Sequence, residues 1–128
     1  MRRNVLQLVG SFHQGGSERQ AVQLTRLLHA SGRYSVRVAT LNPDGVLRGE
    51  VERLDLGAIL EYPLTSFYDR NAIRQFRRCA TFLREQKIDL VQTHDFYTNV
   101  FGMVAAALAG VPARVAAKRE TGGMRSAS

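Results

Sequence analysis

The sequence predicts an α/β fold in which a doubly wound parallel sheet carries helices on both faces. Short apolar runs of strand length alternate with segments of helical periodicity along the 128 residues, which is the pattern of a parallel sheet covered on both sides. The length suits one domain or part of one. The hydrophobic fraction of 45% and the charged fraction of 23% are those of an ordinary globular protein.

The first half of the chain is predicted to contain three strands and two helices. The strands span residues 4–9, 34–41 and 58–63, and the helices span residues 17–30 and 46–55. Ser17 is the expected N-cap of the first helix, and Gln20 completes a capping box. Apolar residues at helical spacing continue that helix, namely Ala21, Leu24, Leu27 and Leu28. The strands end at Gly10, in the turn "NPDG" and at Pro63.

The second half is predicted to contain two helices, at residues 71–86 and 98–109, and two strands, at residues 88–93 and 113–118. The expected buried face of the first of these helices consists of Ile73, Phe76, Ala80 and Leu83. Gly110 and Pro112 end the second helix. The last seven residues, 122–128, show no periodicity and are expected to be mobile.

The usual doubly wound order, with right-handed crossovers, places the first and fourth strands side by side at the centre of the sheet. Ligands of such sheets bind beyond the carboxyl ends of the strands, where the winding reverses. The first strand runs into "GSFHQGGS" and the fourth into "THDFYTN". Both polar clusters are therefore predicted to share one crevice, with "KRETGG" after the fifth strand beside them.

The chain is basic, with a net charge of +7, and a basic balance favours anionic partners. The segment 70–87 carries six basic residues and one acidic residue. It is either a solvated helix face or a surface that docks on anionic lipid headgroups through Arg74, Arg77 and Arg78. Nucleic acid is not an expected partner, since neither a known binding motif nor an aromatic stacking platform accompanies the charge.

The single cysteine, Cys79, excludes an internal disulfide and is typical of a reducing compartment. It falls within a helical pattern and is expected to fill a semi-buried position. The apolar runs are shorter than a secretory or transmembrane segment requires. A cytoplasmic protein is therefore predicted, peripheral on the inner face of the membrane if the basic helix docks there.

The loop "GSFHQGGS" differs from a Walker A pattern because Gly16 stands where the lysine belongs, and it does not match G-x-G-x-x-G. Gly15 and Gly16 nevertheless precede a helix N-terminus, where free backbone N–H groups and the helix dipole suit an anion. Two interpretations stay open. The loop is either a phosphate-binding turn or a turn that needs glycine only for its backbone angles.

His94 and Asp95 follow the fourth strand and are further candidates. Adjacent residues of an extended strand point to opposite faces, so the two do not form a catalytic dyad by sequence alone. Structural and catalytic roles for His94 both stay open. No metal site is expected, since three scattered histidines and one cysteine offer no ligand spacing.

Four stretches carry a family resemblance that covers residues 4 to about 121. They are "VLQLVGSFHQGGSERQAVQLTRLL", "YSVRVATL", "IDLVQTHDFYTNVFGMVAAALAGVP" and "ARVAAKRE". The more specific parts are the glycine pair followed by a small residue and Glu18, and the pattern D-x-V-x-T-H from Asp89 to His94. In this order and at this spacing they resemble the N-terminal domain of retaining GT-B glycosyltransferases of the group-1, family-four type.

The resemblance implies two Rossmann-like domains facing a cleft, of which the N-terminal one binds the acceptor and the C-terminal one holds a nucleotide-sugar donor. It implies that Gly15 and Gly16 approach the donor diphosphate and that His94 is a catalytic residue in the cleft wall. The remaining acceptor-side residues implied are His13, Asp95, Arg119 and Glu120. The resemblance implies no cofactor and no metal, because backbone amides and basic side chains stabilise the leaving diphosphate.

The sequence departs from the family pattern where Gln92 replaces a frequent histidine, and where Lys118, Arg119 and Glu120 stand in place of another. Residues 1–121 are expected to form an incomplete acceptor-side domain, with the donor domain outside the 128 residues. The predicted activity is transfer of a sugar, of hexosyltransferase type, to a cell-envelope saccharide or lipid-linked acceptor. The alternative is a stand-alone Rossmann-like module that binds a phosphorylated small molecule without catalysis.

Overall fold

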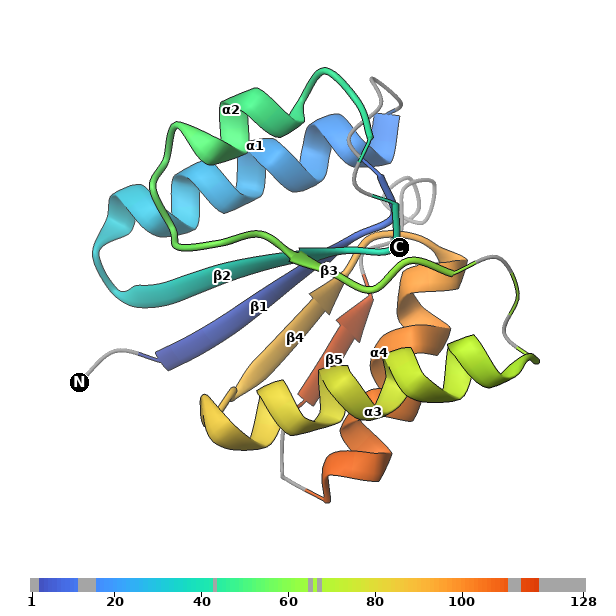
Figure 1. Ribbon diagram of the computed structural model, residues 1–128. Coiled ribbons are helices and arrows are strands. Elements are labelled where there is room, and N and C mark those ends of the chain that lie inside the picture. The colour runs from blue at the N-terminus through green and yellow to red at the C-terminus, as the bar shows by residue number, and fades with distance from the viewer. Residues whose placement is uncertain are drawn as a thin grey trace, which may run out of the picture.

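The computed structural model of the chain describes residues 3–11, 16–42, 44–64, 66, 68–110 and 114–117. Helices and strands alternate along it, as Figure 1 shows. In chain order they are β1 (Arg3–Val9), α1 (Gly16–Ser31), β2 (Tyr34–Thr40), α2 (Arg48–Glu52), β3 (Leu60–Glu61), α3 (Arg70–Glu85), β4 (Leu90–Thr93), α4 (Phe96–Ala109) and β5 (Arg114–Ala117).

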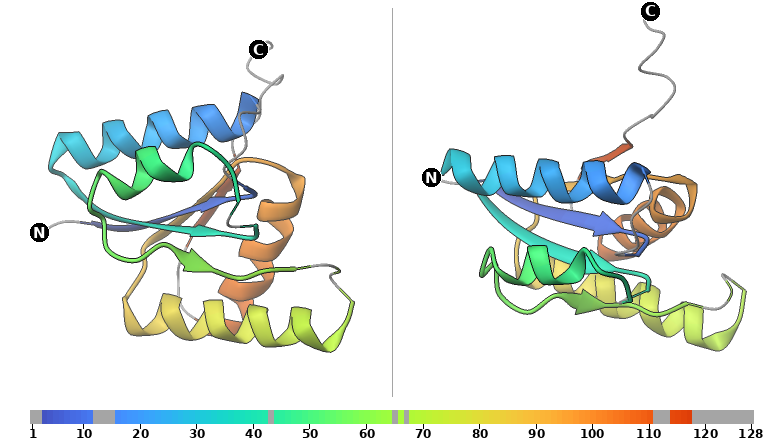
Figure 2. Two further views of the ribbon diagram at one scale, coloured as in Figure 1. Left: turned by 45° about the horizontal axis from the view of Figure 1, so that its top comes forward. Right: turned by 90° about the horizontal axis from the view of Figure 1, so that it is seen from above.

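These five strands form one parallel sheet in the order β3-β2-β1-β4-β5. Val5 of β1 pairs with Val36 of β2 on one side and with Leu90 of β4 on the other. Helices α1 and α2 cover one face of the sheet, and α3 and α4 cover the other (Figure 2). The predicted Rossmann-like, doubly wound sheet is confirmed, with its first and fourth strands adjacent at the centre.

The larger core cluster lies between the sheet and helices α3 and α4. Leu6 and Leu8 contribute to it from β1, and Phe76 and Phe101 contribute from the helices. The ring centroids of Phe76 and Phe101 are 5.0 Å apart, and those of Tyr62 and Phe101 are 5.6 Å apart. Full burial of one such side chain stabilises the fold by roughly 1.5–3 kcal/mol.

The smaller core cluster lies between the sheet and helices α1 and α2. Its members are Val9, Ala21, Val22, Val38, Leu47 and Val51. Because side chains alternate along a strand, Val9 faces α1 whereas Leu8 faces the opposite layer. The same alternation places Gln7 on the α1 side of the sheet, although its side chain is fully buried.

The structure explains why glycine stands at Gly102, within α4, and at Gly110, directly after it. At Gly102 a Cβ atom would lie 3.2 Å from Thr93 Cγ2 and 3.4 Å from Val91 Cγ1, so glycine allows the helix to approach β4 closely. At Gly110 the backbone is left-handed, with φ at 63°, and it caps the helix as predicted.

Several predicted element ends shift in the structure. The prediction of Ser17 as an N-cap is wrong, because α1 begins at Gly16 and Ser17 lies in its first turn. Strand β3 has only two residues of the six predicted over 58–63. Helix α4 begins at Phe96, two residues earlier than predicted, because the Asp95 side chain caps it.

The buried faces of α1 and α3 also differ from prediction in detail. The buried stripe of α3 contains Ala72, Phe76, Cys79, Ala80 and Leu83. It is centred on Cys79, which is 1% exposed rather than semi-buried, and it leaves Ile73 53% exposed. On α1, Leu27 is 57% exposed, whereas Thr25 is buried, and its hydroxyl is satisfied by donating to the Ala21 carbonyl at 2.7 Å.

The predicted mobility of residues 122–128 lies outside the described residues. Within the part of the chain that the structure describes, no helix combines the length and the apolar character needed to cross a bilayer.

Candidate functional site

The candidate site lies at the carboxyl ends of β1 and β4, which are neighbours at the centre of the sheet. The chain leaves β1 for α1 on one face of the sheet and leaves β4 for α4 on the other, so the winding reverses between them (Figure 1). Gly10 and Ser11 follow β1, and His94 and Asp95 follow β4. Both predicted polar clusters therefore begin at the same edge of the sheet.

A chain of three polar side chains ends at His94. The His94 ring is 3% exposed, and its Nε2 lies 2.7 Å from Gln7 Oε1. The Gln7 Nε2 in turn donates to Gln92 Oε1 at 2.8 Å. Because the Gln7 carbonyl oxygen faces the ring, His94 Nε2 carries the hydrogen in this arrangement. These bonds offset the cost of burying the Gln7 amide between apolar neighbours.

Asp95 has a structural role at the start of α4. Its carboxylate accepts from the Thr98 backbone N–H at 2.8 Å, and the Thr98 hydroxyl accepts from the Asp95 backbone N–H at 3.2 Å. The same hydroxyl accepts from the His94 backbone N–H at 3.1 Å. This capping box fixes the backbone that carries His94. Contact of Asp95 with an acceptor stays a prediction.

The two strand ends approach each other closely at Gly10. A Cβ atom at Gly10 would lie 2.8 Å from Asp95 Oδ2, so a larger residue there would displace the cap. Ser11 is nearly buried, and its hydroxyl donates to Glu18 Oε2, in the first turn of α1, at 3.0 Å. An acidic side chain in that turn complements the helix dipole. The carboxylate also adds a negative charge near the place predicted for a phosphate.

The other predicted cleft residues are only partly covered by the structure. Gly16 is the first residue of α1, which agrees with its predicted place at a helix start. The structure does not describe His13, Gly15, Arg119 or Glu120, so their predicted roles lie outside the described residues. Among the residues that it does describe, no three His, Cys, Asp or Glu side chains converge where they could hold a metal ion.

Cys79 lies on α3, and its thiol faces the core. Burial raises the pKa of the Cys79 thiol to about 12, and burial also raises the pKa of Tyr62, to which the thiol is hydrogen-bonded. The thiol is therefore protonated at neutral pH and unreactive. Cys79 therefore fills space in the core, as predicted, but it is more deeply buried than predicted.

Gln7 is the site residue that sequence reasoning missed. It interrupts the apolar run of the first strand, and a polar residue between buried neighbours needs a hydrogen-bonding partner. Its partner became visible only from the register, which pairs Gln7 with Gln92.

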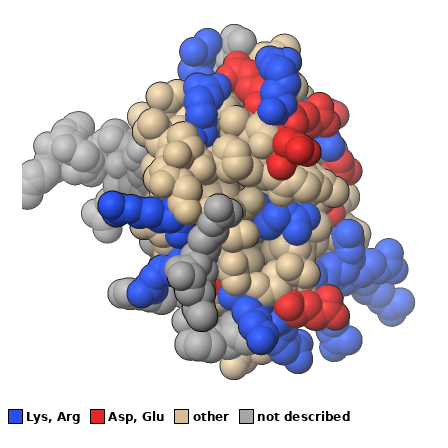
Figure 3. All heavy atoms as spheres, turned by 90° about the vertical axis from the view of Figure 1, so that its left-hand side faces the viewer, with Lys and Arg blue, Asp and Glu red and all other residues tan. Residues whose placement is uncertain are grey.

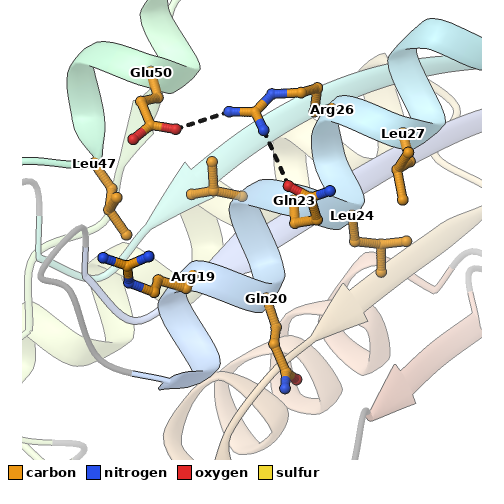
Figure 4. Close-up of a pocket in the computed structure, with 9 residues that line it drawn as sticks. Arg19, Gln20, Gln23, Leu24, Arg26, Leu27, Leu47 and Glu50 are labelled. Carbon is orange, nitrogen blue, oxygen red and sulfur yellow. Dashed lines mark hydrogen bonds and ion pairs between the residues drawn. The ribbon is translucent and has the colours of Figure 1, made fainter.

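A hollow of about 510 Å³ lies along α1 where it meets α2 (Figure 4). Arg26 crosses it, donating to Glu50 Oε1 at 2.8 Å and to Gln23 Oε1 at 3.0 Å. None of the described residues at the carboxyl ends of β1 and β4 lines this hollow. We therefore do not assign the hollow to the candidate site.

Several solved structures resemble the chain in fold. A glycosyltransferase from Rickettsia africae superposes with a TM-score of 0.68 at 19% identity, covering 91% of this chain and 29% of that chain. MurG from Acinetobacter baumannii gives a TM-score of 0.56 at 17% identity, covering 95% of this chain and 38% of that chain. The C-terminal domain of a hydrogenase from Pyrococcus furiosus gives a TM-score of 0.54 at 18% identity, with 90% and 91% covered.

Likeness at these identities shows the fold alone, since one fold hosts many activities. The chain spans 29% of the length of the Rickettsia africae protein. A search of curated proteins found no matching sequence. A family model described as Glycosyltransferase Family 4, however, matches residues 14–116. Since that match extends over most of the 128 residues, the chain belongs to glycosyltransferase family 4.

Proposed function

We propose that this chain forms the acceptor-side part of a glycosyltransferase that moves a sugar from a nucleotide-sugar donor to a saccharide or lipid-linked acceptor of the cell envelope. The observation that carries the proposal is the position of His94, at the winding reversal of a family-4 domain. Ligands of doubly wound sheets bind at this point.

The proposed reaction is a substitution at the anomeric carbon of the donor sugar, with retention of configuration. The bond between that carbon and the diphosphate oxygen breaks, the acceptor oxygen forms a new bond to the carbon, and the proton of the acceptor hydroxyl passes to the leaving diphosphate. Holding both reactants in place supplies roughly 7–11 kcal/mol of such a barrier. The acceptor-side wall contributes by presenting one reactant to the other.

His94 is proposed to contact the transferred sugar from the acceptor-side wall of the cleft. Its low exposure restricts any contact to a small part of the ring. Gln7 positions the ring by fixing Nε2, and the capping box fixes the backbone on its other side. The backbone amides at Gly15 and Gly16 are proposed to approach the leaving diphosphate, where preorganised donors stabilise developing charge.

The proposal is tested by measuring sugar transfer from a panel of radiolabelled nucleotide sugars. The assay uses the protein as its gene encodes it and, separately, the 128-residue chain. Donor-dependent labelling of an acceptor by the encoded protein is the expected result. The 128-residue chain by itself is expected to give background rates, because the proposed donor-holding residues lie outside it. Tight binding of a phosphorylated small molecule without transfer from any donor would favour a non-catalytic binding module instead.

A further inference from the structure

The outer face of α3 carries a regular row of arginines. Arg70, Arg74 and Arg77 are separated by four and three residues, which is the spacing of one helix face. All three are exposed, and Thr81 and Arg84 continue the same line. The buried stripe of α3 lies on the opposite side, around Cys79. We call Arg70, Arg74 and Arg77 the α3 arginine row.

No carboxylate that the structure describes pairs with the α3 arginine row. The ion pairs among the described residues join Arg26 to Glu50 and Arg48 to Glu52 and Glu61, and none of them involves α3. In Figure 3, basic side chains project along the lower right edge, on the α3 side of the molecule, whereas acidic side chains gather mainly above them. The positive charge of this face is therefore available to a partner.

Arg78 differs from the α3 arginine row. Its guanidinium lies 5.2 Å from the centroid of the Tyr62 ring and donates to the Glu61 carbonyl at 3.1 Å. These contacts hold Arg78 against β3 and its flanking residues. The predicted surface of Arg74, Arg77 and Arg78 is accordingly better described as Arg70, Arg74 and Arg77, with Arg78 at its edge.

A shallow hollow of about 420 Å³ runs along this face. Its lining consists of Arg70, Ile73, Arg74, Arg77, Arg78 and Thr81, and it includes no carboxylate. Guanidinium groups bind phosphate oxygens in a bidentate geometry. Ile73, half exposed between the arginines, adds an apolar side chain to this basic surface.

We propose that the α3 arginine row docks the protein on the anionic phospholipid headgroups of a membrane. From Arg70 to Arg84 the line is about 21 Å long, at 1.5 Å per residue. It therefore extends over several headgroups and is too long for one phosphate. Tyr68, 96% exposed just before α3, supplies the kind of aromatic side chain that is enriched at membrane interfaces. A lone exposed ring beside the row does not form the succession of aromatic rings on which nucleic-acid bases stack.

The inference does not depend on sugar transfer, because it rests only on the charge and exposure of α3. The test measures co-sedimentation of the 128-residue chain with vesicles. One set contains phosphatidylcholine with about 30% phosphatidylglycerol, and the other contains phosphatidylcholine alone. Binding is expected for the anionic vesicles only, and it should weaken strongly between about 0.1 M and about 0.5 M salt.

The critical variant combines Arg70→Gln, Arg74→Gln and Arg77→Gln. Anionic vesicle binding should fall on the order of 100-fold, since each basic residue near such a surface is worth roughly fivefold. The matched control combines Arg19→Gln, Arg33→Gln and Arg53→Gln, three exposed residues outside α3 that remove the same charge. The control should bind nearly as the unsubstituted chain does. Circular dichroism verifies that both variants are folded.

Four results would overturn the proposal. Equal binding to neutral vesicles would remove the role of charge, and equal losses in the two variants would assign binding to net charge rather than to α3. Binding of the unsubstituted chain that does not weaken with salt would also exclude an electrostatic attachment. Duplex DNA that competes with vesicles and needs the same arginines would assign the surface to nucleic acid.

Discussion

The polar side chains at the carboxyl end of the sheet and those on the outer face of α3 differ in whether they bond to other side chains of the protein. At the sheet, His94, Gln7 and Gln92 are linked side chain to side chain across two central strands. On α3, Arg70 and Arg74 point outward, and no carboxylate that the structure describes pairs with them. One set of groups is bonded within the fold, and the other is left open to solvent.

The first region therefore contributes to the stability of the fold, whereas the second is free to bind a partner. A buried donor or acceptor that loses its partner costs about 1–3 kcal/mol, so a change at Gln7 must affect folding together with any activity. An exposed charge without a partner contributes little to the fold. Substitutions on the outer face of α3 should therefore affect only what binds there.

The largest expected effect concerns catalysis at His94. With His94→Asn in the protein as its gene encodes it, kcat/KM for sugar transfer should fall on the order of 100-fold, which is the usual effect of removing one preorganised polar group from a reaction site. Asparagine is too short to meet Gln7 Oε1 where Nε2 does. His94→Gln is the matched control, because its longer amide can still donate to Gln7 Oε1 and keep the buried network. Unchanged kinetics in both folded variants would remove His94 from the reaction.

The next effect concerns the buried network itself. Gln7→Leu should lower the free energy of unfolding by about 1–3 kcal/mol, because His94 Nε2 and Gln92 Oε1 both lose their partner. Urea denaturation measures this loss. Gln92→Leu is the graded comparison, since it removes only the partner of Gln7 Nε2, keeps the bond between Gln7 and His94, and should therefore cost less than Gln7→Leu. A Gln7→Leu chain as stable as the original would show that the network contributes nothing to folding.

The sequence was sufficient to predict the architecture, because periodicity and turn residues are local properties. Alternating strands and helices led to the sheet order, and Gly110 marked the end of α4 correctly. Ile73 shows where such patterns fail. It lies three residues before Phe76, but the buried stripe is centred on Cys79, which leaves Ile73 at its edge.

The candidate site was less accessible from sequence, because its meaning depends on contacts between distant residues. His94 could be located as the end of a central strand, but its bond to Gln7 requires the register of β1 with β4. Asp95 was visible as a candidate, and its place three residues before Thr98 is a capping pattern that could have identified its structural role. The contact of Arg78 with Tyr62 depends on how α3 packs against the chain around β3.

The buried face of α3, where Cys79 lies, predicts how the stability of the protein changes at alkaline pH. Burial raises the pKa of Cys79 from 9.0 to about 12, so the fold favours the neutral thiol. Its contribution to stability is complete below pH 9 and is lost as the pH rises from 9 toward about 12. Urea midpoints between about pH 7 and about pH 11 should therefore fall less steeply for Cys79→Ala than for the original chain. Tyr62→Phe tests the neighbouring hydroxyl in the same way, and parallel slopes in all three chains would contradict the raised pKa of the thiol.

The smallest expected effect concerns the stability of the variant that replaces Arg70, Arg74 and Arg77 with glutamine. Its free energy of unfolding should change by less than about 0.5 kcal/mol, as for most surface substitutions. Glutamine is a good helix former, and removing the repulsion between Arg70 and Arg74, four residues apart, should add a few tenths of a kcal/mol at low salt. Arg48→Gln is the contrasting control, because Arg48 forms ion pairs with Glu52 at 3.1 Å and with Glu61 at 2.9 Å. This variant should lose up to about 1 kcal/mol of its free energy of unfolding. Urea denaturation at low and high salt measures both. A loss above about 1 kcal/mol in the α3 variant would show that its arginines serve the fold, and the contrast between the two regions would then fail.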